Sequence, residues 1–245
     1  MNKKYALALA FLITLLIAST HYLFSLDNTK TARQTVILAR VIDGDTFKIQ
    51  DGQSVRLLNI NAPEKNMPNA GLSKEFLKNF ENHTLELETV GQDKYGRILA
   101  RVYFSDYVNL KLIEFGMASK FLVDESELRL FAESEQKAIL EGKGIWQHSP
   151  YFGCIKAKIL PEEEMIILQN LCSADMHEWY LKDESRKVYY FDKSFDRINL
   201  HSEKGNDNAT DLFWQSATEI WNNDRDTLYL FDKDGKIIYS VSYGY

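Results

Sequence analysis

The stretch Val41-Ile-Asp-Gly-Asp-Thr-Phe-Lys-Ile-Gln-Asp-Gly-Gln-Ser-Val-Arg-Leu-Leu-Asn-Ile-Asn-Ala-Pro-Glu64 decides the fold of the first half of this chain. An Asp-Gly pair at 51–52 separates two apolar-alternating runs, which predicts a β-hairpin. Side chains alternate along a strand, so Asp45 and Arg56 can share one face of it. We expect Asn61-Ala-Pro63 to break the pairing, because proline cannot donate to a ladder, and Glu64 to emerge from the break. Carboxylates bind a cation and arginine binds an anion, so this combination is typical of a site that binds a metal ion together with a phosphodiester.

Working outward, the chain from 35 to 149 alternates strand and helix patterns. β-branched or alternating runs predict strands over 35–41, 46–49, 54–58, 84–90 and 98–104. Apolar residues at helical spacing predict helices over 72–80, 107–115 and 126–141, the last stopped by Gly142 and Gly144. Short strands with one early and two late helices indicate an α+β domain, namely a small closed barrel of the oligonucleotide-binding type.

The chain from 153 to 245 reads as all-β. Seven short runs separated by turn residues predict an antiparallel β-sandwich. Both cysteines, Cys154 and Cys172, lie in this part. In an exported protein such a pair favours one disulfide, and two free buried thiols are the alternative.

Composition narrows the function classes. The chain has 245 residues, 45% of them hydrophobic, which is enough for two cored domains. The net charge is −6, and residues 151–245 carry 11 basic and 17 acidic side chains. This balance argues against a protein that coats nucleic acid through a basic surface. Strong binding of nucleic acid through counterion release is therefore not expected.

Residues 1–26 read as a targeting segment, followed by a polar linker over 27–34. Lys3 and Lys4 precede a run from Tyr5 to Phe24 that is nearly all apolar. The run is about long enough to cross a bilayer, and Ile17-Ala18-Ser19 is a tolerable cleavage site, so both a membrane anchor and a cleaved signal remain open. Either reading predicts an extracytoplasmic body, because the lysines favour an inside N-terminus.

Four motifs together carry a family resemblance. Ile42-Asp-Gly-Asp-Thr46, Arg56-Leu-Leu-Asn-Ile-Asn-Ala-Pro-Glu64, Asp93-Lys-Tyr-Gly-Arg97 and Gly142-x-Gly-Ile-Trp146 resemble the staphylococcal nuclease (thermonuclease) family in order and spacing. The resemblance implies a five-stranded barrel with three helices. It also implies a Ca²⁺-dependent phosphodiesterase that acts on DNA and RNA and leaves 3′-phosphate and 5′-hydroxyl ends.

The resemblance also implies roles for individual residues. Arg56 and Arg97 would clamp the phosphate, since a guanidinium fork donates to two phosphoryl oxygens. Glu64 would act as general base or position the water. Taken singly, each arginine is more often a surface cation, and their joint occurrence is what favours the site.

For the metal, the resemblance implies Asp45, the side chain at position 61 and the Ala62 carbonyl as ligands. The family normally has aspartate where this chain has Asn61, so the oxygen count is kept and one negative charge is lost. Weaker Ca²⁺ binding is expected, because charge count tunes such sites. Asp45 as a turn-capping acid beside Gly44 is the alternative.

We expect the loop before Arg97 to contact the substrate. Lys94 and Tyr95 would touch the substrate phosphate, although Tyr95 could equally be a ring at the edge of the core. The stretch Phe121-Leu-Val-Asp124 lacks the tyrosine with which the family often stacks a base, and an acid appears there. Only Lys65 remains in the loop after Glu64 to steer substrate, so weak binding is expected.

The second part has a resemblance of its own. Trp179-Tyr-Leu-Lys-Asp183, Thr210-Asp-Leu-Phe-Trp214 and the stretch from Trp221 to Gly235 resemble the lamin-tail domain. This implies an immunoglobulin-like sandwich used for binding, and its acidic balance favours an envelope or protein partner over DNA.

The sequence as a whole predicts an exported, monomeric nuclease with an appended sandwich. The rival hypotheses are a catalytically weak nuclease-like module that binds nucleic acid or protein at the envelope, and a scaffold whose sandwich is the working part.

Overall fold

The computed structural model describes residues 14, 15, 33–65 and 67–245. The predicted N-terminal signal or anchor and most of the linker therefore lie outside the described residues. Within the described part of the chain, no helix is both long and apolar enough to cross a membrane.

The first half is a closed barrel. Its strands are β1 Gln34–Val41, β2 Thr46–Ile49, β3 Ser54–Leu57, β5 Thr84–Gln92 and β6 Ile98–Phe104. Neighbours pair antiparallel in the order β3-β2-β1-β5-β6, and a parallel pairing of β3 with β6 closes the ring. Alternate residues such as Leu38, Phe47, Val55 and Leu87 fill its interior and are fully buried. The predicted five-stranded barrel is confirmed, and the predicted strand bounds agree within two residues.

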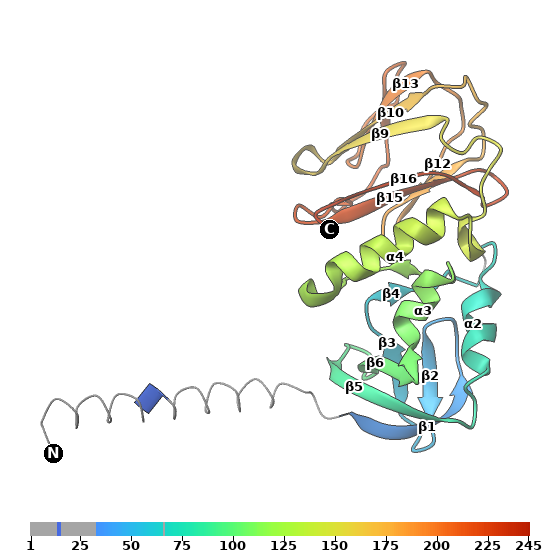
Figure 1. Cartoon of the computed structure of the whole chain (residues 1–245). Helices are drawn as coiled ribbons and strands as arrows, with labels where there is room; N and C mark the ends of the chain where they lie inside the picture. The colour runs from blue at the N-terminus through green and yellow to red at the C-terminus, as the bar shows by residue number, and fades with distance from the viewer. Residues whose placement is uncertain (1–13, 16–32, 66) are drawn as a thin grey trace, which may run out of the picture.

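Three helices cover the barrel (Figure 1). They are α2 Gly71–Lys78, α3 Val108–Glu114 and α4 Leu128–Leu140. A 3-10 turn, η1 Glu125–Glu127, leads into α4, and Gly142 and Gly144 follow it with positive φ angles. A side chain at Gly144 would meet the backbone of Gly116 at 2.2 Å, so only glycine fits there. This close approach helps to seat Trp146 in the core, where it is fully buried.

Short strands that the sequence did not reveal fasten the loops of the site. β4 Ile60–Asn61 pairs with β8 Ser119–Lys120, and β7 Asp106–Tyr107 extends β6. The hairpin strand β3 ends at Leu57, earlier than the break expected over Asn61-Ala-Pro63, and Asn61 pairs with Ser119 of β8, so that only Ala62 and Pro63 of that stretch are unpaired. Two-residue strands are too short to show a period of two, which is why the pattern missed them.

The second half consists of two four-stranded sheets. One contains β9 Ile155–Leu160, β10 Met165–Asn170, β13 Arg197–His201 and β14 Asp211–Phe213, and the other β11 Tyr180–Lys182, β12 Val188–Tyr190, β15 Asp226–Phe231 and β16 Ile237–Tyr243. Both contribute to one core that includes Leu168, Leu200, Leu228 and Leu230. All seven predicted strands are present; β14 is additional, and its parallel pairing with β13 departs from the predicted antiparallel arrangement. The two sheets lie as separate layers in Figure 1.

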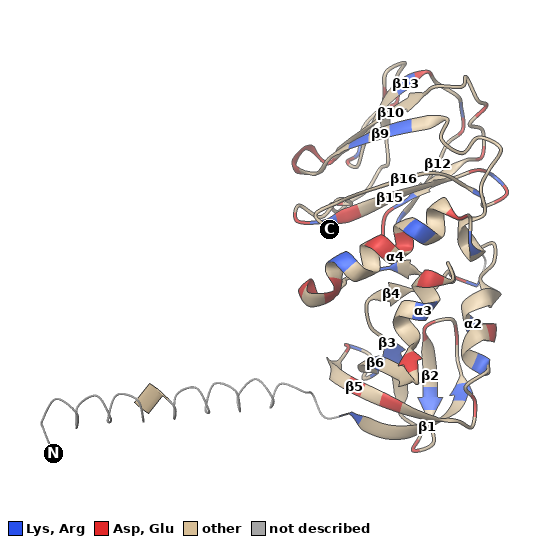
Figure 2. Cartoon of the chain, viewed as in Figure 1, with Lys and Arg blue, Asp and Glu red and all other residues tan. Residues whose placement is uncertain are grey.

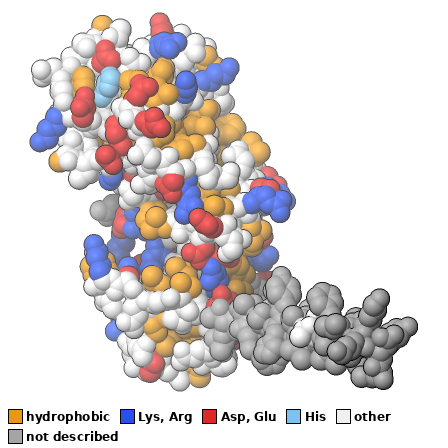
Figure 3. Space-filling model, turned by 90° about the vertical axis from the view of Figure 1, so that its left-hand side faces the viewer, with side chains coloured by type: hydrophobic (Ala, Val, Ile, Leu, Met, Phe, Trp, Pro, Cys, Tyr) orange, Lys and Arg blue, Asp and Glu red, His pale blue; other side chains and the backbone are white. Residues whose placement is uncertain are grey.

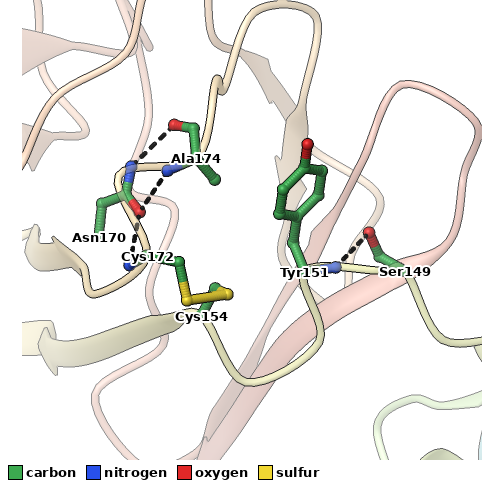
Figure 4. The surroundings of a disulfide bond; sticks show 6 residues. All are labelled: Ser149, Tyr151, Cys154, Asn170, Cys172 and Ala174. Atoms are coloured by element: carbon green, nitrogen blue, oxygen red, sulfur yellow. Dashed lines mark hydrogen bonds between the residues drawn. A yellow bond between two sulfur atoms is a disulfide. The ribbon is translucent and has the colours of Figure 1, made fainter.

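The predicted disulfide is present. Cys154 precedes β9 and Cys172 follows β10, and the bond joins these two ends (Figure 4). Asn170 orders the same corner, since its Oδ1 accepts from the Ala174 amide at 3.1 Å and its Nδ2 donates to the Ala174 carbonyl at 2.9 Å.

The two halves meet across α4, which lies between the barrel and the sheet that holds β15 and β16 (Figure 1). Trp146 stacks on Tyr229 with ring centroids 5.1 Å apart, and Ala138, Ile139 and Phe231 join the same buried cluster. Charged residues of both signs lie along α4 in Figure 2. One of them, Glu135, is buried, and its Oε2 accepts from Lys120 Nζ at 2.8 Å and from the Tyr229 hydroxyl at 2.9 Å. The contact between the halves therefore combines a buried apolar cluster with a buried ion pair.

Candidate active site

A cavity of about 1050 Å³ opens where the β1–β2 turn, β3, β4 and the loop before β6 meet. Every site residue predicted from the sequence lines it, namely Asp45, Arg56, Asn61, Ala62, Glu64, Lys94, Tyr95 and Arg97. Lys and Arg side chains gather in a hollow at the left edge of Figure 3, between the two halves of the molecule.

Asp45 is held by its own turn and by the loop after β4. The Asp45 amide donates to Asp43 Oδ1 at 3.1 Å, so Asp43 stabilises the turn. Asp45 Oδ1 accepts from the Thr46 hydroxyl at 3.1 Å, and Oδ2 accepts from the Ala62 amide at 3.0 Å. The carboxylate is almost fully buried and reaches across to a second element, so it does more than cap its turn.

Arg56 lies beside Asp45 because Thr46 and Arg56 are paired across the hairpin. Its Nη2 lies 3.2 Å from Asp45 Oδ2 and donates to Asn61 Oδ1 at 2.7 Å and to the Ile60 carbonyl at 2.8 Å. Burial lowers the pKa of Arg56, the negative charge of Asp45 counteracts this, and the nearby charges of Arg186 and Arg97 lower it further. The guanidinium is thus fixed at the base of the cavity.

Arg97 lines the same cavity from the position directly before β6. Asp93 holds it through a bond of 2.7 Å from Arg97 Nε to Asp93 Oδ2, and Nη1 donates to Thr46 Oγ1 at 3.3 Å. The Tyr95 ring lies 5.5 Å from the guanidinium carbon and is 71% exposed. The alternative of Tyr95 as a core-edge ring is therefore wrong. Lys94 Nζ lies 5.1 Å from the same ring, at the mouth of the cavity.

The stretch after β8 lines the cavity with apolar side chains, and its one acidic residue does not face the cavity. Phe121 and Leu122 line the cavity. Asp124, by contrast, turns away and pairs with Arg101, which also binds Glu88 and Glu127. The acid therefore does not face the substrate region.

One residue at the centre of the cavity was not foreseen. Arg186, from the turn between β11 and β12, reaches 122 residues back along the sequence to Glu64 and pairs with it through Nη1. Its Nη2 donates to Asp45 Oδ2 at 3.2 Å, Asn61 Oδ1 at 3.1 Å and the Ala62 carbonyl at 3.0 Å. In the sequence Arg186 is an arginine in a polar turn, and no local pattern distinguishes it from an exposed one.

The three oxygens around Arg186 Nη2 are those expected to hold a metal, and we call them the oxygen cradle: Asp45 Oδ2, Asn61 Oδ1 and the Ala62 carbonyl. Carboxylate, amide and carbonyl oxygens are the donors that Ca²⁺ prefers, and here they already converge on a positive charge. The donor set therefore fits a hard cation. Among the described residues, no group of three or more His, Cys, Asp or Glu side chains is placed to hold a metal ion, and the cradle itself contains a single carboxylate.

Comparison with known proteins agrees with this geometry. The model of the family described as staphylococcal nuclease homologue matches residues 54–148. The thermonuclease of Staphylococcus intermedius is 34% identical over 140 residues, which cover 51% of this chain and 83% of that protein. The chain belongs to the staphylococcal nuclease family. The endonuclease YncB of Bacillus subtilis is 34% identical over 144 residues, or 49% of this chain and 68% of that protein.

In a third relative, the match covers a smaller share of that protein's length. The SPbeta prophage-derived endonuclease YokF of Bacillus subtilis is 33% identical over 146 residues, which are 50% of this chain and 49% of that protein. Arg56, Glu64 and Arg97 lie within the residues that the staphylococcal nuclease family model matches, whereas Asp45 precedes them and Arg186 follows them. By family and by class the chain is a phosphodiester-hydrolysing nuclease.

Proposed function

We propose that this protein is an extracytoplasmic Ca²⁺-dependent nuclease that cleaves DNA, RNA or both and leaves 3′-phosphate ends. The observation that carries the proposal is the convergence of Arg56, Arg97 and Glu64 on one cavity beside the oxygen cradle. Two guanidinium groups and one carboxylate that can accept a proton are what the hydrolysis of a phosphodiester requires from side chains.

Each side chain has a separate task in this proposal. Arg56 and Arg97 line the same cavity as the buried Asp45 and would bind the phosphoryl oxygens, more strongly as negative charge grows in the transition state. Glu64, 61% exposed at the mouth, would accept a proton from the attacking water at a carboxylate oxygen. Asp45, Asn61 and Ala62 would hold Ca²⁺, which supplies a Lewis acid for a phosphoryl oxygen.

Substrate binding rests on few side chains. Lys94 and Tyr95 at the mouth would contact the neighbouring phosphate, and Lys65 lines the same cavity. With so few cations and an acidic second half, we expect weak, salt-sensitive binding of single strands.

Export and tethering complete the proposal. The basic and apolar start of the chain supports a signal or anchor, and the Cys154–Cys172 disulfide suits an oxidising compartment. We assign residues 35–149 to the nuclease domain and 153–245 to a lamin-tail-like, immunoglobulin-like sandwich that binds an envelope or protein partner. The protein would act as a monomer.

The test compares the purified full-length chain with Glu64→Gln on end-labelled oligonucleotides in Ca²⁺, Mg²⁺ or chelator. We expect cleavage in Ca²⁺, ends that lose their phosphate to a 3′-phosphatase, and a turnover at least about 100-fold lower in the variant. Full activity of Glu64→Gln would remove Glu64 from the reaction.

The rival function is a nuclease-like module that binds without cleaving. The pairing of Arg186 with Glu64 favours it, because that contact occupies the expected base. An oligonucleotide bound but left intact at millimolar Ca²⁺ would select this reading.

A further inference from the structure

The cation that lies in the oxygen cradle belongs to the second half of the chain. Arg186 Nη2 contacts all three cradle oxygens within 3.2 Å, and Nη1 pairs with Glu64. One guanidinium therefore contacts the three expected metal donors and the expected general base together. The buried Nε of Arg186 has no hydrogen-bond partner, so the contacts of the side chain are concentrated in its two terminal nitrogens.

The turn that carries Arg186 is built to aim it. Asp183 fastens the turn, since its Oδ1 accepts from the Lys187 amide at 2.8 Å and its Oδ2 accepts from the Ser185 hydroxyl. Arg186 has a φ angle of 76°, in the left-handed region that side chains with a Cβ seldom adopt. A residue held in that region, where glycine would fit more easily, is typical of a functional contact.

The turn is also docked to the barrel through its neighbour Glu184. The Glu184 carbonyl accepts from Asn61 Nδ2 at 3.0 Å, next to the cradle. The Glu184 carboxylate lies 3.1 Å from the buried Lys120 Nζ and accepts from the Tyr245 hydroxyl at 2.6 Å. Arg186 thus reaches the cradle from a turn anchored on both sides, and its position does not depend on its own contacts alone.

A guanidinium and a divalent metal exclude each other from this cradle. Both require the same three oxygens, and two like charges at about 3 Å repel strongly in a partly buried site. The cradle holds one carboxylate, whose charge is already opposed by Arg56 and Arg186. A divalent ion would gain little attraction there until one of these arginines leaves. Arg56 is 11% exposed and donates to the Leu57 and Ile60 carbonyls, whereas Arg186 is 33% exposed and donates to a single backbone carbonyl, so the Arg186 side chain leaves more easily while its turn stays docked.

We infer that Arg186 is a resident cation of the nuclease site, supplied in cis by the second half of the chain, which a divalent metal must displace to bind. The inference rests on the proposed metal site and assigns the appended sandwich a role in restraining the nuclease. Displacement also frees Glu64, so metal binding and release of the base occur in one event.

The experiment measures binding of Ca²⁺ alone by isothermal titration calorimetry to the full-length chain, Arg186→Gln and a control, Arg197→Gln. Arg197 is an exposed arginine on β13, in the other sheet, so its variant carries the same change in net charge. We expect Arg186→Gln to bind Ca²⁺ about tenfold more tightly than the unaltered chain, and Arg197→Gln to match the unaltered chain. Asp45→Asn should abolish binding in both backgrounds.

The outcomes separate this inference from the proposed function. Equal or weaker Ca²⁺ binding by Arg186→Gln would overturn the inference even if the unaltered chain cleaves DNA in Ca²⁺. Tighter binding with no cleavage by either protein would uphold the inference and reject the proposed activity. Cleavage in chelator that is lost in Arg186→Gln would also overturn it, since Arg186 would then replace the metal. Should Arg186→Gln fail to fold, Arg186→Met also removes the charge and keeps much of the side-chain length, and Ca²⁺ binding by it no tighter than that of the unaltered chain would refute the inference.

Discussion

Replacing Lys120 by methionine should destabilise the protein severely. Lys120 is 1% exposed, and its Nζ lies 2.8 Å from Glu135 Oε2 and 3.1 Å from Glu184 Oε1. Burial alone would lower the pKa of Lys120, but the two carboxylates hold it above its ordinary value, so the amine is charged at pH 7. Removing it leaves two buried carboxylates without a counter-ion.

The expected cost follows from that geometry. Breaking a buried ion pair from one side costs about 3–5 kcal/mol, because the remaining charge is uncompensated. The matched control is Lys111→Met on α3, where Nζ pairs with Glu114 at 2.9 Å but both side chains are more than a third exposed. Such a surface pair contributes less than about 1 kcal/mol.

The assay is urea unfolding followed by tryptophan fluorescence, to which Trp146 contributes from the contact between the halves and three further tryptophans from the second half. Adding Glu135→Gln and Glu184→Gln to Lys120→Met removes the stranded charges and should recover most of the lost free energy. Suppose that Lys120→Met lost no more free energy of unfolding than the control Lys111→Met. The ion pairs of Lys120 with Glu135 and Glu184 would then not hold the two halves together. The anchoring of the Arg186 turn through Glu184 would be refuted as well.

Three further predictions follow from other sites. Burial lowers the pKa of Lys182 to about 8, so the unfolded chain binds this proton more tightly. Stability should then rise between pH 8 and about 10.5, and Lys182→Met should add up to about 3 kcal/mol at pH 7; a flat pH profile in denaturant melts would contradict this. Cys172→Ser opens a bridge of sequence separation 18 and should cost about 3 kcal/mol, and a melting temperature unaffected by the change or by reductant would count against it. Asn61→Asp should tighten Ca²⁺ binding by about tenfold in calorimetry, whereas an unchanged affinity would remove Asn61 from the cradle.

The barrel was predictable because its evidence is local. Asp51-Gly52 specifies the hairpin, and period-two runs specify β5 and β6, so turn chemistry and patterning agree on every long element. Glu135 shows what such patterning overlooks. It lies between Phe131 and Ala138 on the buried face of α4, where an unpaired acid would be costly. That position was a readable signal for a buried partner, although not for its identity.

Arg186 could not be predicted in the same way. Its partners lie 122 to 141 residues away in the sequence, and the turn that holds it is polar and short. A turn arginine is usually solvated, so residue type carries no signal for such a contact. Only the docking of the second half on α4 brings it to the cavity.

Asn61 connects the sequence evidence to the structural evidence. The sequence marked it as the ligand that lacks a charge. In the structure its Oδ1 accepts from Arg56 and Arg186 while its Nδ2 donates to the Glu184 carbonyl. An aspartate could accept from both arginines but could not donate to that carbonyl, and two carbonyl-type oxygens at 3.0 Å would repel. The amide that weakens the cradle for a metal is therefore the group that lets the Arg186 turn dock beside it, and both properties favour the bound arginine over the ion.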